Sequence, residues 1–173
     1  MPLLNFPIQQ QCGKDWCWIT VAVCTDHYYD PTSPWLQGTL ANALIPNLTA
    51  DCSVTPCTQP LPGNCDTAGQ INHSLGYVQR LRTSVSTPIL FGDIKLEIDA
   101  ADPVGHPVCA GIQWMDMSIG HAVVICGYDD SDGSEWITVA DPGDGQTRNL
   151  PFLSFLKNYE GKGTWTNTYY TQK

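Results

Sequence analysis

The chain has 173 residues, of which 42% are hydrophobic and only 14% are charged. This length supports one domain with a buried core and is too short for two of ordinary size, so we expect a single domain over residues 1–173. Acids outnumber bases 17 to 8, the net charge is −9, and no cluster of Lys or Arg occurs. That excludes binding to nucleic acid or to anionic lipid through clustered positive charge. No apolar stretch approaches the roughly 18 residues of a membrane span, and the first residues show no signal peptide.

Two helices are expected near the start of the chain. Asp15 is a suitable N-cap for a helix over 16–29, with the sequence WCWITVAVCTDHYY. Ser33 followed by Pro34 is a second start signal, because proline suits the first helical position. The second helix would run through WLQGTLANALI.

A Pro- and Gly-rich segment then covers residues 47–66, which we call the cysteine loop. After it, Thr67 and Gln70 have the spacing of a capping box and predict a short helix. Asp93 is the expected cap of a fourth helix, IKLEIDA, over 94–100.

Beyond residue 107 the pattern changes to strands. Apolar and β-branched runs bounded by turn residues predict three central strands over 108–114, 121–128 and 135–141. An edge strand, a short helix and a last strand are predicted over 146–150, 151–159 and 163–171. The expected fold class is therefore α+β, with a helical N-terminal half packed on a C-terminal antiparallel sheet.

The eight cysteines differ in their surroundings. Three lie in apolar runs and are predicted to be small buried side chains: Cys24, Cys109 and Cys126. Three lie in the cysteine loop, where a disulfide would stabilise a segment that cannot bury much of itself: Cys52, Cys57 and Cys65. A zinc site that includes His73 is the competing interpretation, although the spacing matches no paired short-knuckle pattern, and we expect no metal.

Cys17 is the candidate nucleophile. It falls in the opening turn of the first predicted helix, where the positive end of the helix dipole stabilises a thiolate. Its backbone N–H is an unpaired donor at the helix start and is available to a developing oxyanion. Gln11 lies six residues earlier across a Gly-containing turn and could present its amide to the same oxygen.

His121 is the candidate base. It follows Gly120 at the head of a very apolar strand, where an imidazole has no packing role. The other histidines are expected to be structural: His27, His73 and His106. A hairpin in which paired positions sum to about 263 places His121 opposite a residue near 142. Asp141 is the acid in that window, and the alternative is that it only ends the strand in an Asp-Pro turn.

At these residues the sequence resembles the papain-like cysteine peptidases. The shared features are the step from Gln11 to Cys17, the Cys-Trp pair, the Gly-His that opens a strand, and the order Gln, Cys, His, Asp. Within that group it is most similar to bacterial effector peptidases, the plant-pathogen avirulence proteases. The similar segments include WCWITVAV, GHAVVICGYDD, VADPGDG and GTWTNTYYT, and together they touch most of residues 9–171. The double-glycine peptidases that process bacteriocins are more distant relatives.

The resemblance implies a papain-like fold with the active site in a cleft between the helical part and the sheet. It assigns Cys17 as nucleophile, His121 as general base and acid, Asp141 as orienting group and Gln11 as oxyanion-hole donor. The sequence departs from papain in using Asp where papain has Asn, and in placing Cys12 where papain has Gly. A disulfide or an oxidised thiol at Cys12 would affect where Gln11 lies.

The loop that enters the His121 strand is the expected wall of a substrate cleft, at Met117, Ser118, Ile119 and Gly120. The expected substrate is a polypeptide and the expected enzyme is a monomer without cofactors, with an activating or inhibitory protein as a possible partner. The family implies a protein that is secreted or delivered to a target cell.

Two other functions use the same residues or the same fold. Amidases and acyl transferases that act on isopeptides or peptidoglycan cross-links use the same order of Cys, His and Asp. A degenerate peptidase fold can also serve as a binding module, but loss of the nucleophile is its usual mark and here Cys17 is present.

Overall fold

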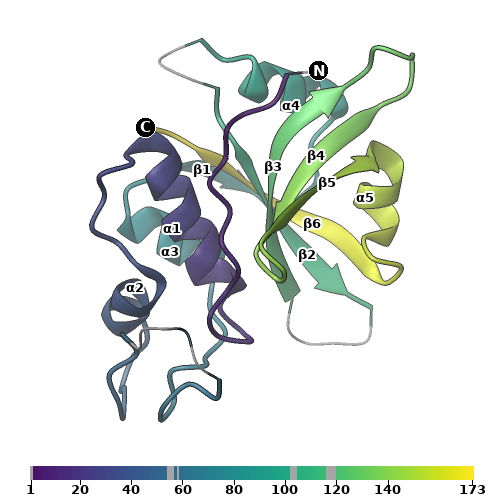
Figure 1. Ribbon diagram of the computed structural model, residues 1–173. Helices are drawn as coiled ribbons and strands as arrows, with labels where there is room; N and C mark the ends of the chain where they lie inside the picture. Colours follow the sequence, from purple (N-terminus) through teal and green to yellow (C-terminus); the bar gives the residue numbers. More distant parts are fainter. Residues whose placement is uncertain (1, 54–56, 58, 102–104, 116–119) are drawn as a thin grey trace.

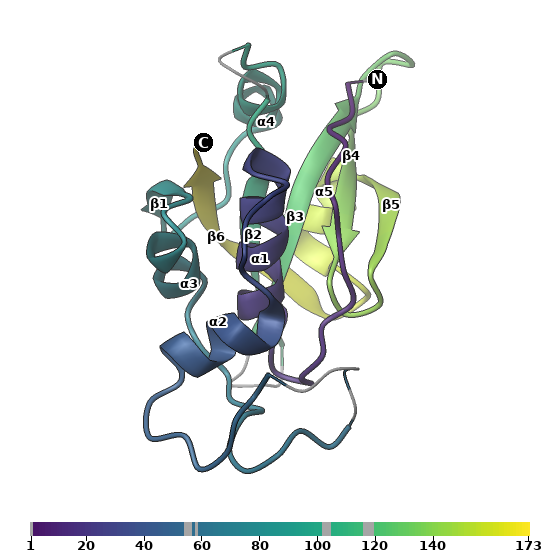
Figure 2. The same cartoon turned by 60° about the vertical axis from the view of Figure 1, so that its left-hand side comes forward.

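Six antiparallel strands form one sheet, and helices cover both of its faces (Figures 1 and 2). The structure is a computed structural model that describes residues 2–53, 57, 59–101, 105–115 and 120–173. The helices are α1 (Cys17–Tyr29), α2 (Gln37–Leu44), α3 (Ile71–Tyr77), α4 (Phe91–Ile98) and α5 (Phe152–Asn158). The strands are β1 (Leu81–Val85), β2 (Val108–Trp114), β3 (Gly120–Asp129), β4 (Trp136–Asp141), β5 (Gln146–Pro151) and β6 (Gly163–Thr171). The α+β class expected from the sequence is confirmed.

The strand order in the sheet is β1-β6-β2-β3-β4-β5. Strands β2 to β5 follow one another along the chain, so each pairs with its neighbour through a hairpin. The exception is β6, which returns to lie between β1 and β2. The last strand of the chain is therefore an inner strand, next to the edge strand β1.

Side chains along β2 and β3 point alternately to the two faces of the sheet, and so the interior is divided into two cores. Cys109 and Val124 point to the face that α1, α2 and α3 cover. Val108 and Val123 point to the opposite face, where α4 and α5 pack. Because successive side chains of a strand point to opposite faces, a strand buried on both sides is apolar throughout, as AVVIC is.

α1 lies in the interior of the helical half. Each residue from Trp18 to Asp26 is buried, so this helix is enclosed on all sides and has no wide polar face. A buried ion pair closes its C-terminal end, where Arg80 Nε lies 2.7 Å from the Asp26 carboxylate. The C-terminal end of α1 is thereby tied to the residue that precedes β1.

Residues 2–11 form an extended N-terminal segment, the strap, that runs along the sheet (Figure 1). Leu4 donates its N–H to the carbonyl of Cys126 at 2.8 Å, and further on Gln11 donates to the carbonyl of Pro142 at 2.7 Å. The strap therefore passes from one end of β3 to the turn that follows β4, and brings Gln11 to the same end of the sheet as Asp141.

The strands expected after residue 107 are confirmed within one residue at each end. β5 is an edge strand, as predicted. The strand β1 was not predicted, because LRTSV is largely exposed and has no apolar alternation.

The expected helix caps are wrong. α1 begins at Cys17 with Trp16 as its N-cap and no side-chain bond to the helix start, so Asp15 does not cap it. α2 begins at Gln37, with Leu36 as its N-cap. The Ser33 hydroxyl donates to Asp26 and accepts the Trp35 N–H at 3.3 Å, in a turn that ends before the helix.

The next two helices also start differently. The Thr67 hydroxyl donates to the Asn64 carbonyl at 2.6 Å and does not cap α3, which begins after Gln70. Asp93 is the third residue of α4, and its carboxylate accepts the Leu90 N–H at 3.2 Å.

Two disulfides join Cys12 to Cys57 and Cys52 to Cys65. The three cysteines of the apolar runs are free and buried, as predicted, and Cys17 is free and partly exposed.

Among the described residues no His, Cys, Asp or Glu cluster is suited to hold a metal ion, which leaves the zinc interpretation without support there. Within the same residues no helix has the length and apolar character needed to cross a membrane.

Candidate active site

Cys17 is the first residue of α1. The first N–H groups of a helix have no partner within the helix, and their dipoles point toward the space before it. A thiolate at this position is stabilised by that field. The opening turn expected for Cys17 is confirmed, although the residue that precedes it as N-cap is Trp16.

The segment before Cys17 is braced by the end of the cysteine loop. The Asp66 carboxylate accepts the backbone N–H groups of Lys14 at 3.1 Å and Asp15 at 2.9 Å. The buried Trp16 indole donates to the Cys65 carbonyl at 2.6 Å. Since Cys65 is itself held by a disulfide, the cysteine loop fixes the backbone that presents the candidate nucleophile.

His121 and Asp141 are brought together at one end of the sheet, where β3 begins and β4 ends. His121 Nε2 lies 2.7 Å from Asp141 Oδ1, and both side chains are largely buried. The strands pair Val124 with Ala140, and a register shift lies between Ile125 and Gly127. The numbers of two paired residues therefore sum to 264 and, beyond the shift, to 265 instead of the expected 263. The imidazole still reaches the carboxylate.

The Asp141 carboxylate has several further partners. Oδ1 also accepts the Gly143 N–H at 2.7 Å, and Oδ2 accepts the hydroxyl of Tyr159. The guanidinium of Arg148 lies 3.7 Å from Oδ2. Burial raises the pKa of Asp141, but the hydrogen bonds from His121 and Tyr159 outweigh it and hold that pKa below its ordinary value.

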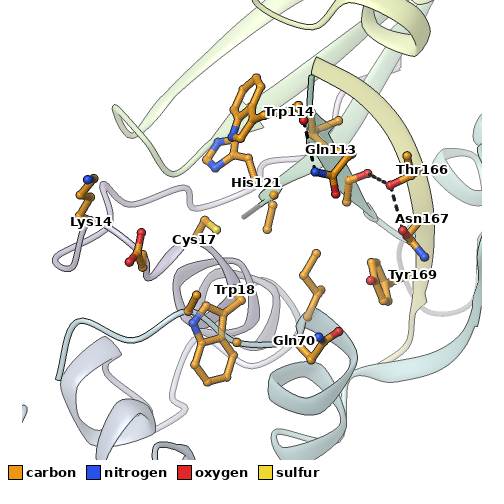
Figure 3. A pocket seen from close by; sticks show the side chains of 18 residues that line it. Lys14, Cys17, Trp18, Gln70, Gln113, Trp114, His121, Thr166, Asn167 and Tyr169 are labelled. Atoms are coloured by element: carbon orange, nitrogen blue, oxygen red, sulfur yellow. Dashed lines mark hydrogen bonds between the residues drawn. The ribbon is translucent and has the colours of Figure 1, made fainter. Parts of the chain in front are cut away.

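The charged form of His121 is favoured. Burial of the imidazole works against it, but hydrogen bonds to Asp141 and to Cys17 raise the pKa of His121 to about 10. A carboxylate can only accept, so Nε2–H donates to Asp141 and Nδ1 is the nitrogen left for Cys17. Figure 3 shows the Cys17 thiol and the His121 ring side by side at the cleft.

Trp114 covers the imidazole. Its ring stacks on His121 with centroids 5.7 Å apart and an angle of 19° between planes. Tyr159 stacks near the same indole at 6.2 Å and 26°, and the Lys162 ammonium lies 5.1 Å from the ring centroid of Trp114. The last residue of β2 therefore separates the His121 ring from solvent on one side (Figure 3).

A cleft of about 530 Å³ opens beside Cys17 and His121. One wall comes from the start of α1 and from residues 68–71, and the other comes from β2, β3 and β6. The described lining includes side-chain amides and aromatic rings (Figure 3), at Trp18, Gln70, Gln113, Trp114, Asn167 and Tyr169. Besides His121, charged residues enter this lining only at Lys14 and Asp15.

Gln11 lies beside the loop that precedes Cys17 but is not one of the cleft's described lining residues. Its amide nitrogen donates to the carbonyls of Gly13 at 2.9 Å and Lys14 at 2.5 Å. Its Oε1 is buried and has no partner in the described part of the chain. The structure thus brings Gln11 close to the candidate nucleophile while its donor group is occupied by the loop.

The expected substrate wall is described in part. Gly120 lines the cleft. Met117, Ser118 and Ile119 lie outside the described residues.

Sequence reasoning missed three residues that support the site: Asp66, Trp114 and Tyr159. Asp66 follows the last cysteine of the loop, and Trp114 ends a predicted strand. The sequence therefore indicates where each residue lies along the chain, but not which residue it contacts. Nothing in the sequence near Tyr159 indicates its contact with Asp141.

Comparison with known families covers nearly the whole chain. The sequence profile described as "Peptidase_C39 like family" matches residues 3–171. No curated protein is significantly similar to the chain. The match takes in the helical half with Cys17 and the sheet with His121 and Asp141, and so the chain belongs to the Peptidase_C39-like family, a family of cysteine peptidases.

Proposed function

We propose that the protein is an endopeptidase of the papain-like type that cleaves peptide bonds through an acyl-enzyme on Cys17. The observation that carries the proposal is the line of contacts from Cys17 to His121 and on to Asp141, beside a cleft that Cys17 and His121 both line. A nucleophile, a base in contact with it and a group that orients the base are the parts this reaction needs.

The first half of the reaction forms a thioester. The Cys17 thiolate attacks the carbonyl carbon while His121 is protonated, which gives a tetrahedral oxyanion. The Cys17 N–H, at the start of α1, donates to that oxyanion. His121 then gives its proton to the leaving amine as the C–N bond breaks.

The second half hydrolyses the thioester. His121, now neutral, takes a proton from water, and the hydroxide attacks the thioester carbonyl. The C–S bond breaks and releases a carboxylic acid together with the Cys17 thiolate. Asp141 holds the same imidazole nitrogen through both halves and stabilises its charged form.

Gln11 is the proposed second oxyanion donor. To act, its amide has to exchange one of its bonds to the Gly13 and Lys14 carbonyls for a bond to the substrate. Such bonds often tighten only when substrate is bound.

The lining of the cleft supports a peptide as substrate. A peptide presents N–H donors and C=O acceptors at regular intervals, and side-chain amides such as those of Gln70 and Asn167 offer both kinds of group. Trp114 and Tyr169 provide aromatic surface for uncharged side chains. An extended, largely uncharged peptide segment therefore fits these walls best.

We also propose that the protein works outside the cell that makes it or inside a target cell, as a secreted effector. The two disulfides support this, because such bonds persist in oxidising compartments. Alkylation of unfolded protein tests the pairing: four thiols should react before reduction and eight after it.

The test of the proposed chemistry is brief iodoacetamide treatment at pH 6, followed by intact and peptide-mapped mass spectrometry. Wild type should be labelled rapidly at Cys17 alone, and His121→Ala should lose that rapid reaction. Cys24→Ser is the matched control, because it removes a buried free thiol on the same helix. Slow or indiscriminate labelling of reduced and non-reduced wild type would contradict the proposal. Acyl transfer to an added amine without hydrolysis would favour the acyl-transferase alternative.

A further inference from the structure

We infer that Tyr159 is a positioning residue for the proposed reaction, because its hydroxyl holds the Asp141 carboxylate in the orientation that His121 needs. The inference rests on the proposed function. It assigns to Tyr159 no contact with substrate, and its action passes through Asp141.

Tyr159 is itself held firmly. It follows α5, and its backbone exchanges hydrogen bonds in both directions with Gly163, each 2.8 Å long. The residue is 1% exposed, and its ring packs edge-on against Phe155 with centroids 5.4 Å apart. Because the backbone pairing and the ring packing hold the Tyr159 side chain in place, its hydroxyl can hold the Asp141 carboxylate in place.

The two oxygens of Asp141 have separate tasks. Oδ1 accepts from His121 and from the Gly143 N–H, and Oδ2 accepts from the Tyr159 hydroxyl. Arg148 is the competing partner of Oδ2, at 3.7 Å, and it is already paired with Asp144 and Glu160. Without the hydroxyl, the carboxylate would turn toward Arg148 and away from the imidazole.

Tyr159 also remains a donor over the working pH range. Burial and the nearby Asp141 charge raise the pKa of Tyr159, so the phenol stays protonated. The same ring stacks near Trp114, which in turn stacks on His121. Tyr159 therefore supports both partners of the pair, the carboxylate by a hydrogen bond and the imidazole through one intervening ring.

The test is Tyr159→Phe, which keeps the ring and removes the hydroxyl. Tyr29→Phe is the matched control, since Tyr29 is buried and its hydroxyl shares a 2.7 Å hydrogen bond with Thr171 at the opposite end of α1 from Cys17. In Tyr159→Phe we expect kcat to fall by roughly 10- to 100-fold, the range for a lost hydrogen bond to a charged group, with KM nearly unchanged. The acid limb of Cys17 alkylation should move to higher pH, because a carboxylate with one donor fewer is easier to protonate.

NMR of the His121 ring protons gives a readout that needs no peptidase activity. The Nε2–H resonance should be shifted or broadened in Tyr159→Phe and unchanged in Tyr29→Phe. Unchanged kcat and an unchanged resonance in Tyr159→Phe would overturn the inference, and so would equal losses in both variants. A wild-type protein that hydrolyses no peptide would refute the proposed function alone, since the resonance would still report whether Tyr159 positions the pair.

Discussion

Replacing Asp141 by Asn tests whether the site depends on a charge at this position or only on an acceptor. The carboxylate is buried and accepts from His121, Gly143 and Tyr159. Asn has one acceptor oxygen, which can take the place of Oδ1. Its amide group then faces the Tyr159 hydroxyl, which can turn its proton away, and the Arg148 guanidinium, which cannot.

The magnitude follows from those bonds. A hydrogen bond to a charged group contributes about 1.5–3 kcal/mol to stability and a neutral one about 1 kcal/mol, so Asp141→Asn should cost about 2–4 kcal/mol. Asp141→Ala leaves the largely buried His121 and Tyr159 donors without their acceptor and should cost about 3–5 kcal/mol.

The pH dependence has a defined sign. The pKa of His121 is raised from 6.5 to about 10, so the stability that the charged pair adds is complete below 6.5 and is lost as pH rises toward 10. The pKa of Asp141 is lowered, so the stability that its ionised carboxylate adds is lost only in strong acid. The difference between wild type and Asp141→Asn should therefore be largest near pH 6 and shrink above pH 10.

Urea unfolding at pH 6 and at pH 10.5 measures this difference. The pH profile of kcat/KM adds a second readout, because the basic limb reports loss of the imidazolium proton. Without the carboxylate charge, that limb should move down by about one pH unit or more. Equal destabilisation at both pH values, together with an unmoved basic limb, would refute the reasoning that the charge of Asp141 sets the state of His121.

Three further outcomes are expected. Gln11→Ala should lower kcat roughly a hundredfold or more, since one oxyanion donor is worth about 3 kcal/mol, and an unchanged kcat would remove Gln11 from the proposed hole. Replacing Cys52 and Cys65 by Ser should cost about 3 kcal/mol in thermal unfolding and slow Cys17 alkylation, because the loop that braces the nucleophile is released. Gly69→Ala should cost about 1–3 kcal/mol and lower kcat/KM, since its Cβ would lie 2.5 Å from the buried Trp18 ring on the cleft wall; unaltered stability would show that the ring can move aside.

The sequence predicts the sheet well because its signals are local. Strands over 108–141 are apolar on both faces and end in Gly, Asp and Pro, so their existence and order follow from neighbouring residues. The contact between His121 and Asp141 follows from the same hairpin, even though a register shift after Ile125 moves the pairing. The roles of these two residues stay predictions until the variants are measured.

The features that were missed depend on partners far away in the sequence. Asp15 has the chemistry of an N-cap, but Asp66 takes the backbone donors of that segment across 51 residues. The strand β1 exists because β6 pairs with it, and its own side chains are mostly exposed. Tyr159 reaches Asp141 only once α5 has docked on the sheet. No local sequence pattern predicts contacts of this kind.

The position of β6 has a consequence for the order in which the protein matures. β6 pairs with both β1 and β2, and it supplies Thr166, Asn167 and Tyr169 to the cleft. A nascent chain that has reached only residue 160 already contains the candidate triad, but its sheet is missing an inner member and its cleft lacks one wall. Translation must therefore pass residue 171 before the candidate catalytic groups and both walls of the cleft exist together.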